Sequence, residues 1–138
     1  MKLTFIDASV LIAAARGGTL QSERAMAILD DPERLFASSP FLRLEVLPRA
    51  RFNRRTTEVA FYEAFFRAVS SWADDLAAIV EAAEAESSRH GLEAMDALHV
   101  AAAALIGASE LVTCEKPGRS IHLAQAVQVV TLHPAGET

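Results

Sequence analysis

The sequence contains a single cysteine, Cys114, among its 138 residues. One cysteine cannot form an internal disulfide, and it excludes a zinc site built from several cysteines, so we interpret it as a small buried apolar residue. Basic residues are in the minority, because 13 Lys and Arg stand against 18 Asp and Glu for a net charge of −5. A surface that attracts polyanions everywhere is therefore excluded, and nucleic-acid binding would need a local positive patch.

The chain also lacks a long hydrophobic run. Its most apolar stretch, MDALHVAAAALIGA at residues 95–108, is shorter than a membrane span and contains Asp96 and His99. Asp7 interrupts the first apolar run, and no site resembling a signal-peptide cleavage site follows it. We therefore expect a cytoplasmic protein that does not bind a membrane. The 51% hydrophobic content predicts one ordered domain, residues 1–138, with its own core.

Segments typical of strands and helices alternate along the chain. Short apolar runs predict strands at residues 3–6, 34–38, 110–114 and 127–132. Helical spacing predicts helices at residues 9–15, 21–31, 38–52, 56–72, 75–90 and 93–107. Thr56 or Thr57 should cap the fourth helix, and Pro48 should kink the third. Strands separated by helices predict an α/β fold, a three-layer α/β/α sandwich with a central parallel sheet.

Four carboxylates stand at places that this architecture makes significant. Asp7 directly follows the first predicted strand, and Glu115 follows the strand at residues 110–114. Ligands of open α/β sheets bind outside the carboxyl ends of the strands. Asp96 lies in the first turn of an alanine-rich helix, and Glu45 lies among apolar neighbours on another helix. We therefore expect the four acids to converge at one end of the sheet.

Each acid taken alone has a simpler interpretation. Asp7 could only cap the following helix, and Asp96 could only complement the helix dipole. Glu45 could extend into water, and Glu115 could be an ordinary loop residue. His99, three residues after Asp96, could be a metal ligand or a satisfied histidine of the interior or rim. The order of the four acids along the chain, rather than any one of them, favours a shared site.

A cluster of arginines follows the predicted strand at residues 34–38. Five arginines fall within thirteen positions. A solvated basic face is the simpler interpretation, and a patch that contacts phosphates is the alternative, since guanidinium groups match phosphate oxygens. The cluster comprises Arg43, Arg49, Arg51, Arg54 and Arg55.

Four segments, FIDASVLIAAA, LRLEVLPRA, EAMDALHVAAAA and LVTCEK, resemble in order and spacing the signatures of PIN domains. The VapC-type toxins of bacterial toxin–antitoxin pairs are the most similar members, and the resemblance runs from about Lys2 to Val130. It implies that Asp7, Glu45 and Asp96 are the family's acids. The hydroxyls that orient carboxylates or bound water would be those of Ser9 and Thr113. One departure is that Glu115 stands where the family usually has an aspartate, which has a shorter side chain.

The resemblance implies an endoribonuclease that depends on Mg²⁺ or Mn²⁺ and hydrolyses RNA with a metal-activated water. Asp7 and Asp96 are the expected direct ligands, Glu45 would bind directly or through water, and Glu115 would complete the cluster or hold a second ion. The arginine cluster then becomes a candidate RNA-contacting surface. The alternative is a PIN scaffold that binds RNA or a protein without cutting. A receiver-like phosphoacceptor domain ranks third, because Lys116 directly follows Glu115 and is a poor match for the lysine of that fold.

The predicted helix at residues 56–72 has an apolar stripe that is broader than one core contact needs. Large apolar surfaces that remain exposed mark interaction sites. We therefore expect a homodimer, with a groove between this helix and the preceding one that accepts an apolar segment of a cognate antitoxin. The stripe consists of Val59, Phe61, Tyr62, Phe65, Phe66 and Val69.

Overall fold

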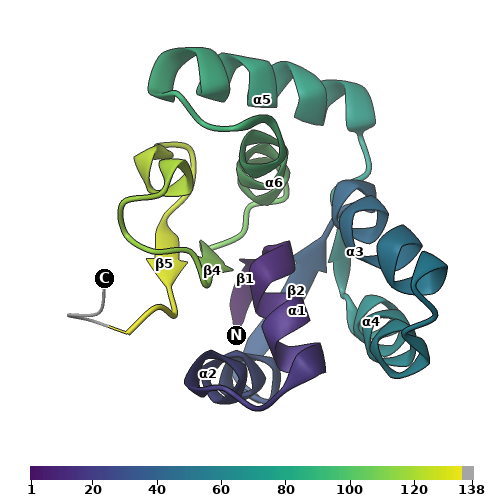
Figure 1. Ribbon diagram of the computed structural model, residues 1–138. Helices are drawn as coiled ribbons and strands as arrows, with labels where there is room; N and C mark the ends of the chain where they lie inside the picture. Colours follow the sequence, from purple (N-terminus) through teal and green to yellow (C-terminus); the bar gives the residue numbers. More distant parts are fainter. Residues whose placement is uncertain (135–138) are drawn as a thin grey trace.

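The strands form a parallel sheet with β1 at its centre in the computed structural model, which describes residues 1–134 (Figure 1). The strand order within these residues is β3-β2-β1-β4-β5, and every neighbouring pair is parallel. The strands are β1 (Lys2–Ile6), β2 (Arg34–Ser38), β3 (Ser71–Trp72), β4 (Glu110–Thr113) and β5 (Val129–Thr131).

Helices cover both faces of this sheet. Figure 1 shows α5 and α6 on one side of the strands and α1, α2 and α4 on the other. They are α1 (Ala8–Arg16), α2 (Leu20–Leu29), α3 (Pro40–Phe52), α4 (Thr56–Ala68), α5 (Leu76–His90), α6 (Ala94–Leu105) and the 3-10 helix η1 (Ser120–Leu123). Among the described residues, none of these helices combines the length and the apolar character needed to cross a membrane.

The sheet separates two hydrophobic cores. Successive side chains of a strand point to opposite faces, so Phe5 packs with α5 and α6 whereas Ile6 packs with α1, α3 and α4. In β4, Leu111 and Val112 divide in the same way. The predicted three-layer α/β/α sandwich with a central parallel sheet is therefore confirmed.

The order of the strands creates a crevice beside Asp7. From β1 the chain builds outward through β2 and β3, and it then returns to add β4 on the other side of β1. Helices that leave neighbouring strands in opposite directions open a ligand crevice at the carboxyl ends of those strands. Here Ile6 pairs with Val112, so the residues that follow β1 and β4 lie at this point.

Several predicted boundaries were wrong. The helix expected at residues 56–72 ends at Ala68, and Ser71–Trp72 pair with β2 as an edge strand. A two-residue strand is too short to show the alternation that identifies strands. Arg55, without a side-chain capping bond, takes the N-cap position that we predicted for Thr56 or Thr57. The last strand begins at Val129 rather than at residue 127. The predicted end of α3 at Phe52, with Pro48 inside the helix, is confirmed.

The apolar stripe of α4 is used mainly within the chain. Tyr62, Phe65 and Phe66 are buried, and the Phe66 ring lies 5.4 Å from that of Phe65 between centroids. The excess exposed surface that we expected on α4 is therefore smaller than predicted. Large apolar side chains that remain exposed nearby belong to α3, where Phe52 is 87% exposed and Leu44 is 67% exposed.

Candidate active site

Asp7 lies at the carboxyl end of β1, where hydrogen bonds connect it to β4 and to α1. Its N–H donates to the Val112 carbonyl of β4 over 3.1 Å, and its Oδ1 accepts from the Val10 N–H at 3.3 Å, which caps α1. The Ser9 hydroxyl donates to the same oxygen at 2.5 Å. Burial raises the pKa of this 4% exposed carboxyl, and hydrogen bonds from the Ser9 and Thr113 hydroxyls offset part of that rise. Asp7 therefore caps α1 as expected, and its burial also makes an uncompensated negative charge on its carboxylate unfavourable.

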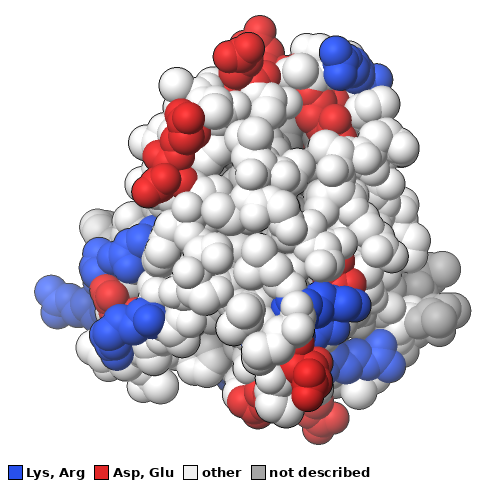
Figure 2. Space-filling view, turned by 180° about the vertical axis from the view of Figure 1, so that it is seen from behind, with Lys and Arg blue, Asp and Glu red and all other residues white. Residues whose placement is uncertain are grey.

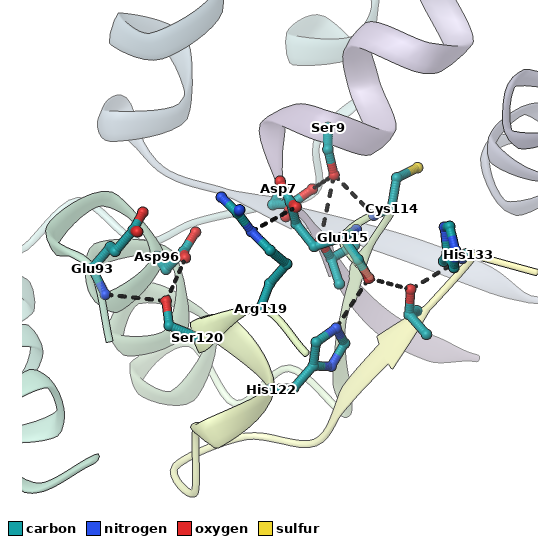
Figure 3. Close-up of polar contacts among 12 residues, drawn as sticks. Asp7, Ser9, Glu93, Asp96, Cys114, Glu115, Arg119, Ser120, His122 and His133 are labelled. Atoms are coloured by element: carbon teal, nitrogen blue, oxygen red, sulfur yellow. Dashed lines mark hydrogen bonds and ion pairs between the residues drawn. The ribbon is translucent and has the colours of Figure 1, made fainter. Parts of the chain in front are cut away.

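The hydroxyls of Ser9 and Thr113 join the ends of β1 and β4. Ser9 Oγ accepts from the Cys114 N–H at 2.8 Å and lies 3.4 Å from Thr113 Oγ1 (Figure 3). Thr113 is fully buried, and its Oγ1 accepts from the Glu115 N–H at 3.1 Å. The two hydroxyls therefore hold the loop after β4 in a fixed relation to Asp7.

Asp96 lies half-buried in the first turn of α6 and belongs to the same acidic region. Burial is the main cause that raises its pKa to about 6, and the charge of Asp7 is the next. The charges of Glu93 and Glu115 raise this pKa further, whereas His99 lowers it. Because carboxylates repel at short range, the effect of the Asp7 charge on Asp96 places the two acids in one electrostatic site.

His99 of α6 connects Glu45 of α3 to this site. The imidazole is 2% exposed, its Nε2 lies 2.7 Å from Glu45 Oε1, and its ring centroid lies 6.0 Å from that of Phe5. A positive charge on His99 lowers the pKa of both Asp7 and Asp96. The third predicted acid is therefore tied to the helix that carries Asp96, while its own side chain remains partly exposed.

Glu115 turns its carboxylate toward Arg119 (Figure 3). Its Oε2 lies 3.5 Å from Arg119 Nε in an ion pair that is open to solvent. The Glu115 carbonyl accepts from the Thr131 hydroxyl at 2.6 Å and from His122 Nε2 at 3.0 Å. The backbone of this acid is thus held by β5 and η1, and its side chain is held by a neighbouring cation.

The four acids provide the oxygen ligands that a divalent cation prefers, but their side chains are not gathered around one point. Carboxylate oxygens are the ligands that Mg²⁺ and Mn²⁺ prefer, and a cation would relieve the repulsion between Asp7 and Asp96. Within residues 1–134, however, no three Asp, Glu, His or Cys side chains form a metal-binding group. The expected convergence of four acids is therefore replaced by a central pair, Asp7 and Asp96. Glu45 and Glu115 flank this pair, each engaged with a basic side chain.

Three side chains around the acids were not assigned a function from sequence. The spacing of three residues between Asp96 and His99 on one helix was the available signal for His99. Arg119 lies four residues after Glu115, but no helix was predicted there. The Ser120 hydroxyl donates to Asp96 Oδ2 at 3.5 Å, and it belongs to η1, which left no periodic pattern in the sequence.

Three of the five arginines in the cluster form ion pairs with carboxylates of α4. Arg49 and Arg54 are exposed, and no ion pair involves them within the described part of the chain. Figure 2 shows basic side chains in small groups mixed with carboxylates, without a continuous basic face in this view. The solvated-face interpretation therefore describes most of the cluster. Arg43 and Arg51 pair with Glu63, and Arg55 pairs with Glu58.

Comparisons with known proteins bear on the fold and the family of this chain. A model of the PIN domain family matches residues 4–116, whereas a search of curated proteins gave no match. VapBC2 from Rickettsia felis, bound to a DNA fragment from its promoter, is similar with a TM-score of 0.70 and 12% identity over 95% of this chain and 99% of that chain. DNA-bound VapBC from Salmonella typhimurium is similar with a TM-score of 0.66 and 19% identity, over 95% of this chain and 98% of that chain. A toxin–antitoxin complex from Klebsiella pneumoniae is similar with a TM-score of 0.61 and 20% identity, over 81% of this chain and 86% of that chain.

The solved structures share the fold at low sequence identity, and the family model covers the segments that contain Asp7, Glu45, Asp96 and Glu115. The resemblance noted in the sequence is thereby confirmed for the greater part of the chain. The chain belongs to the PIN domain family.

Proposed function

We propose that this PIN domain protein is a metal-dependent endoribonuclease, the VapC-type toxin of a toxin–antitoxin pair. The observation that carries the proposal is the pair of Asp7 and Asp96 beside the carboxyl ends of β1 and β4, where burial and the charge of Asp7 raise the pKa of Asp96. Two like charges in a partly dry site are costly unless a cation or a proton compensates them. A bound divalent cation provides that compensation at neutral pH.

The residues around the pair have separable roles in this proposal. Mg²⁺ or Mn²⁺, when bound, would lower the pKa of the attacking water and neutralise charge that develops on the phosphate. Asp7 and Asp96 would hold the ion. Glu45 would bind it directly or through water, and Glu115 would complete the cluster or hold a second ion. Ser9 keeps the Asp7 carboxylate in one orientation through its 2.5 Å hydrogen bond.

The proposed partner is a cognate antitoxin with an apolar segment. The hollow of about 360 Å³ at the turn between α3 and α4, where we expected the antitoxin groove, is lined by Arg51, Arg54, Arg55, Thr56 and Val59, so three guanidinium groups border it. An apolar groove of about 250 Å³ lies instead between α2 and α4. We therefore place the antitoxin segment in this α2–α4 groove. The groove is lined by Met26, Leu29, Asp30, Phe36, Phe61, Ala64, Phe65 and Ala68.

A homodimer and a cytoplasmic location remain part of the proposal. The exposed Leu44 and Phe52 of α3 offer apolar contacts to a second copy, because the α4 side chains that we had assigned to this role are all buried or partly buried. Sedimentation that shows only a monomer at micromolar concentration would remove the dimer from the proposal.

A second candidate function is a module that binds RNA or a protein without cutting. The pairing of Glu45 with His99 and of Glu115 with Arg119 favours it, because both acids already have a basic partner. These pairs must open, or the two acids must act through water, for four carboxylates to serve one metal site.

Cleavage of a labelled single-stranded RNA with EDTA, Mg²⁺ or Mn²⁺ separates the two functions. The wild type should cut only with a divalent cation, Asp96→Asn should not cut, and the exposed α5 variant Glu81→Gln should cut as the wild type does. Wild-type protein that binds the RNA but leaves it intact with both ions would support the non-cutting module instead.

A further inference from the structure

A groove opens beside the acids, between α1, the start of α2 and the loop that follows β4. Its volume of about 420 Å³ lies within the range of roughly 300–1,000 Å³ that is typical of small-ligand pockets. We call it the α1–β4 groove. It is lined by Ser9, Ile12, Ala13, Gln21, Cys114, Glu115, Lys116 and His133.

The groove is continuous with the acidic site because the two share side chains. Ser9 lines the groove and donates a hydrogen bond to Asp7, and Glu115 lines it and contributes to the raised pKa of Asp96. Figure 3 shows Ser9, Cys114 and Glu115 around the loop after β4, with His133 beyond them. A polymer bound across Asp7 and Asp96 would therefore reach this groove with its next unit.

The lining combines three kinds of surface. Ile12 and Ala13 form an apolar wall along α1. On the polar wall, Gln21 Nε2 lies 3.2 Å from His133 Nδ1. Lys116 is exposed at the edge, and it forms no ion pair within the described part of the chain. An apolar wall, an amide with an imidazole, and a free cation are thus presented side by side.

An unpaired nucleotide has the matching set of groups. Proteins bind unpaired bases by packing their faces on apolar or ring surfaces and by hydrogen-bonding their polar edges. A glutamine amide can both donate to and accept from a base edge, and a lysine pairs with phosphate as a point charge. The groove therefore offers one partner for each part of a nucleotide.

We propose that the α1–β4 groove is a subsite for one unpaired nucleotide of the substrate, adjacent to the phosphodiester bond that is cut. This assignment rests on the proposed ribonuclease function and adds the residues that read the base. Gln21 selects the base by its edge, and Lys116 holds a flanking phosphate. It also explains how an acidic chain binds RNA locally although Arg43, Arg51 and Arg55 are paired with carboxylates.

Binding to the groove can be measured without cleavage. Asp96→Asn protein in EDTA is titrated with each of the four ribonucleoside 5′-monophosphates, and the amide signals of Ile12, Ala13 and Lys116 are followed by NMR. At least one nucleotide should shift them saturably, whereas ribose 5-phosphate should shift Lys116 alone. The substitution Ala13→Leu, which fills the groove, should abolish the response. Signals that move with no nucleotide, or equally with ribose 5-phosphate, would overturn the subsite.

Cleavage gives a second readout that distinguishes this proposal from the ribonuclease function itself. With Mn²⁺ and a panel of single-stranded RNAs, Gln21→Ala should lower kcat/KM for the preferred sequence about tenfold and reduce the difference in kcat/KM between bases. An abasic nucleotide at the selected position should remove the difference between Gln21→Ala and wild type. Gln128→Ala, at the amino end of β5 and thus at the opposite end of the strands from the groove, is the matched control and should behave as wild type.

The outcomes separate the two ideas. If the wild type cuts RNA but Gln21→Ala keeps the full preference among bases, the subsite is wrong and the ribonuclease function stands. If the wild type cuts no RNA although nucleotides shift the groove signals, the subsite stands as part of a binding module and the ribonuclease function is wrong.

Discussion

The imidazole of His99 lies 2.7 Å from the Glu45 carboxylate and so joins α6 to α3 by one charged contact. The same ring acts electrostatically on Asp7 and Asp96. His99 is therefore a positioning residue, because it fixes where Glu45 stands relative to the two central acids. Its contribution to cleavage should pass through Glu45.

A double-mutant cycle tests this coupling. His99→Leu should lower kcat at least tenfold and cost about 1 kcal/mol of stability, because a part-buried hydrogen bond to a carboxylate is lost. In a Glu45→Gln background the same replacement should cause little further loss of kcat. His99→Gln, which keeps an N–H donor, should restore part of the activity. Equal losses in both backgrounds would show that His99 does not act through Glu45.

Asp96 should make the stability of the metal-free protein depend on pH. A carboxyl whose pKa rises on folding stabilises the folded state while it is protonated, so this contribution is complete below its ordinary pKa of 3.8 and is lost as pH rises through about 6. After a discount for its half-exposed position, the loss is about 1–2 kcal/mol. Thermal melts of wild type and Asp96→Asn from pH 4 to 8 in EDTA should therefore diverge, with the variant more stable at pH 8.

Mn²⁺ should reverse that difference. A cation that binds only the folded state raises the melting temperature, so Mn²⁺ should stabilise the wild type at pH 7.5 and leave Asp96→Asn nearly unchanged. A capping role alone predicts the opposite, with lower stability of Asp96→Asn under all conditions. If Mn²⁺ shifts neither protein, the metal-site interpretation of Asp7, Glu45, Asp96 and Glu115 fails.

The pairing of Glu115 with Arg119 should restrain metal binding. Arg119→Gln releases the Glu115 carboxylate and removes a positive charge, so Mn²⁺ should bind several-fold more tightly in calorimetric titrations. Glu115→Asp restores the usual side chain of the family and should leave activity equal or higher. Glu115→Gln is the control, because it keeps the size of the side chain without the charge and should weaken Mn²⁺ binding. Unchanged affinity in all three variants would place Glu115 outside the metal site.

The two exposed and unpaired arginines of the cluster should account for its effect on RNA binding. Arg49→Ser with Arg54→Ser should reduce the dependence of RNA affinity on salt, because fewer counterions are released. Arg51→Ser with Arg55→Ser should reduce it less and should also lower the melting temperature, since Glu63 and Glu58 lose partners. Fluorescence anisotropy across a salt series measures the slope. An unaltered slope in the first pair of substitutions would leave the cluster as a solvated face only.

The α2–α4 groove should determine antitoxin binding. Phe61 is partly exposed in its wall, so Phe61→Ser should weaken binding of the antitoxin at least tenfold while the fold is kept. Phe65→Ser is a poorer test because Phe65 is buried in the core and its loss should unfold the protein. Leu105→Ser, at the exposed end of α6, serves as the control and should bind normally. Normal binding by Phe61→Ser would move the antitoxin to another surface.

The sequence predicted the layers of the fold because the β1 and β4 segments are continuous apolar runs and the helices have clear periodicity. It did not predict β3, because Ser71–Trp72 follow α4 after a short gap and show no alternation. The sequence analysis also predicted that the apolar stripe of α4 contacts a second copy of the chain and an antitoxin. In the structure Tyr62 and Phe66 contribute to a core shared with α1 and α3, a contact between segments that no local pattern reveals.

The sequence located the four acids but not their partners. Asp7 and Glu115 could be placed from the ends of strands, and Asp96 could be placed from the start of its helix. The pairing of Glu45 with His99 depends on how α3 crosses α6, which spacing along either helix does not determine. Whether Glu45 and Glu115 bind a metal stays a prediction.

The contacts that hold Ser9 and Asp7 have a consequence for the newly synthesised chain. Asp7 and Ser9 are made early, but their backbone partners, Val112 and Cys114, come from β4, and the Glu115 loop is in turn held by Thr131. Since domains form as the chain emerges from the ribosome, a nascent chain that ends before β4 has three of the four acids but lacks the Val112 and Cys114 backbone partners of Asp7 and Ser9. Under the proposed ribonuclease function, such a chain should not cleave RNA until β4 and the loop after it have been made.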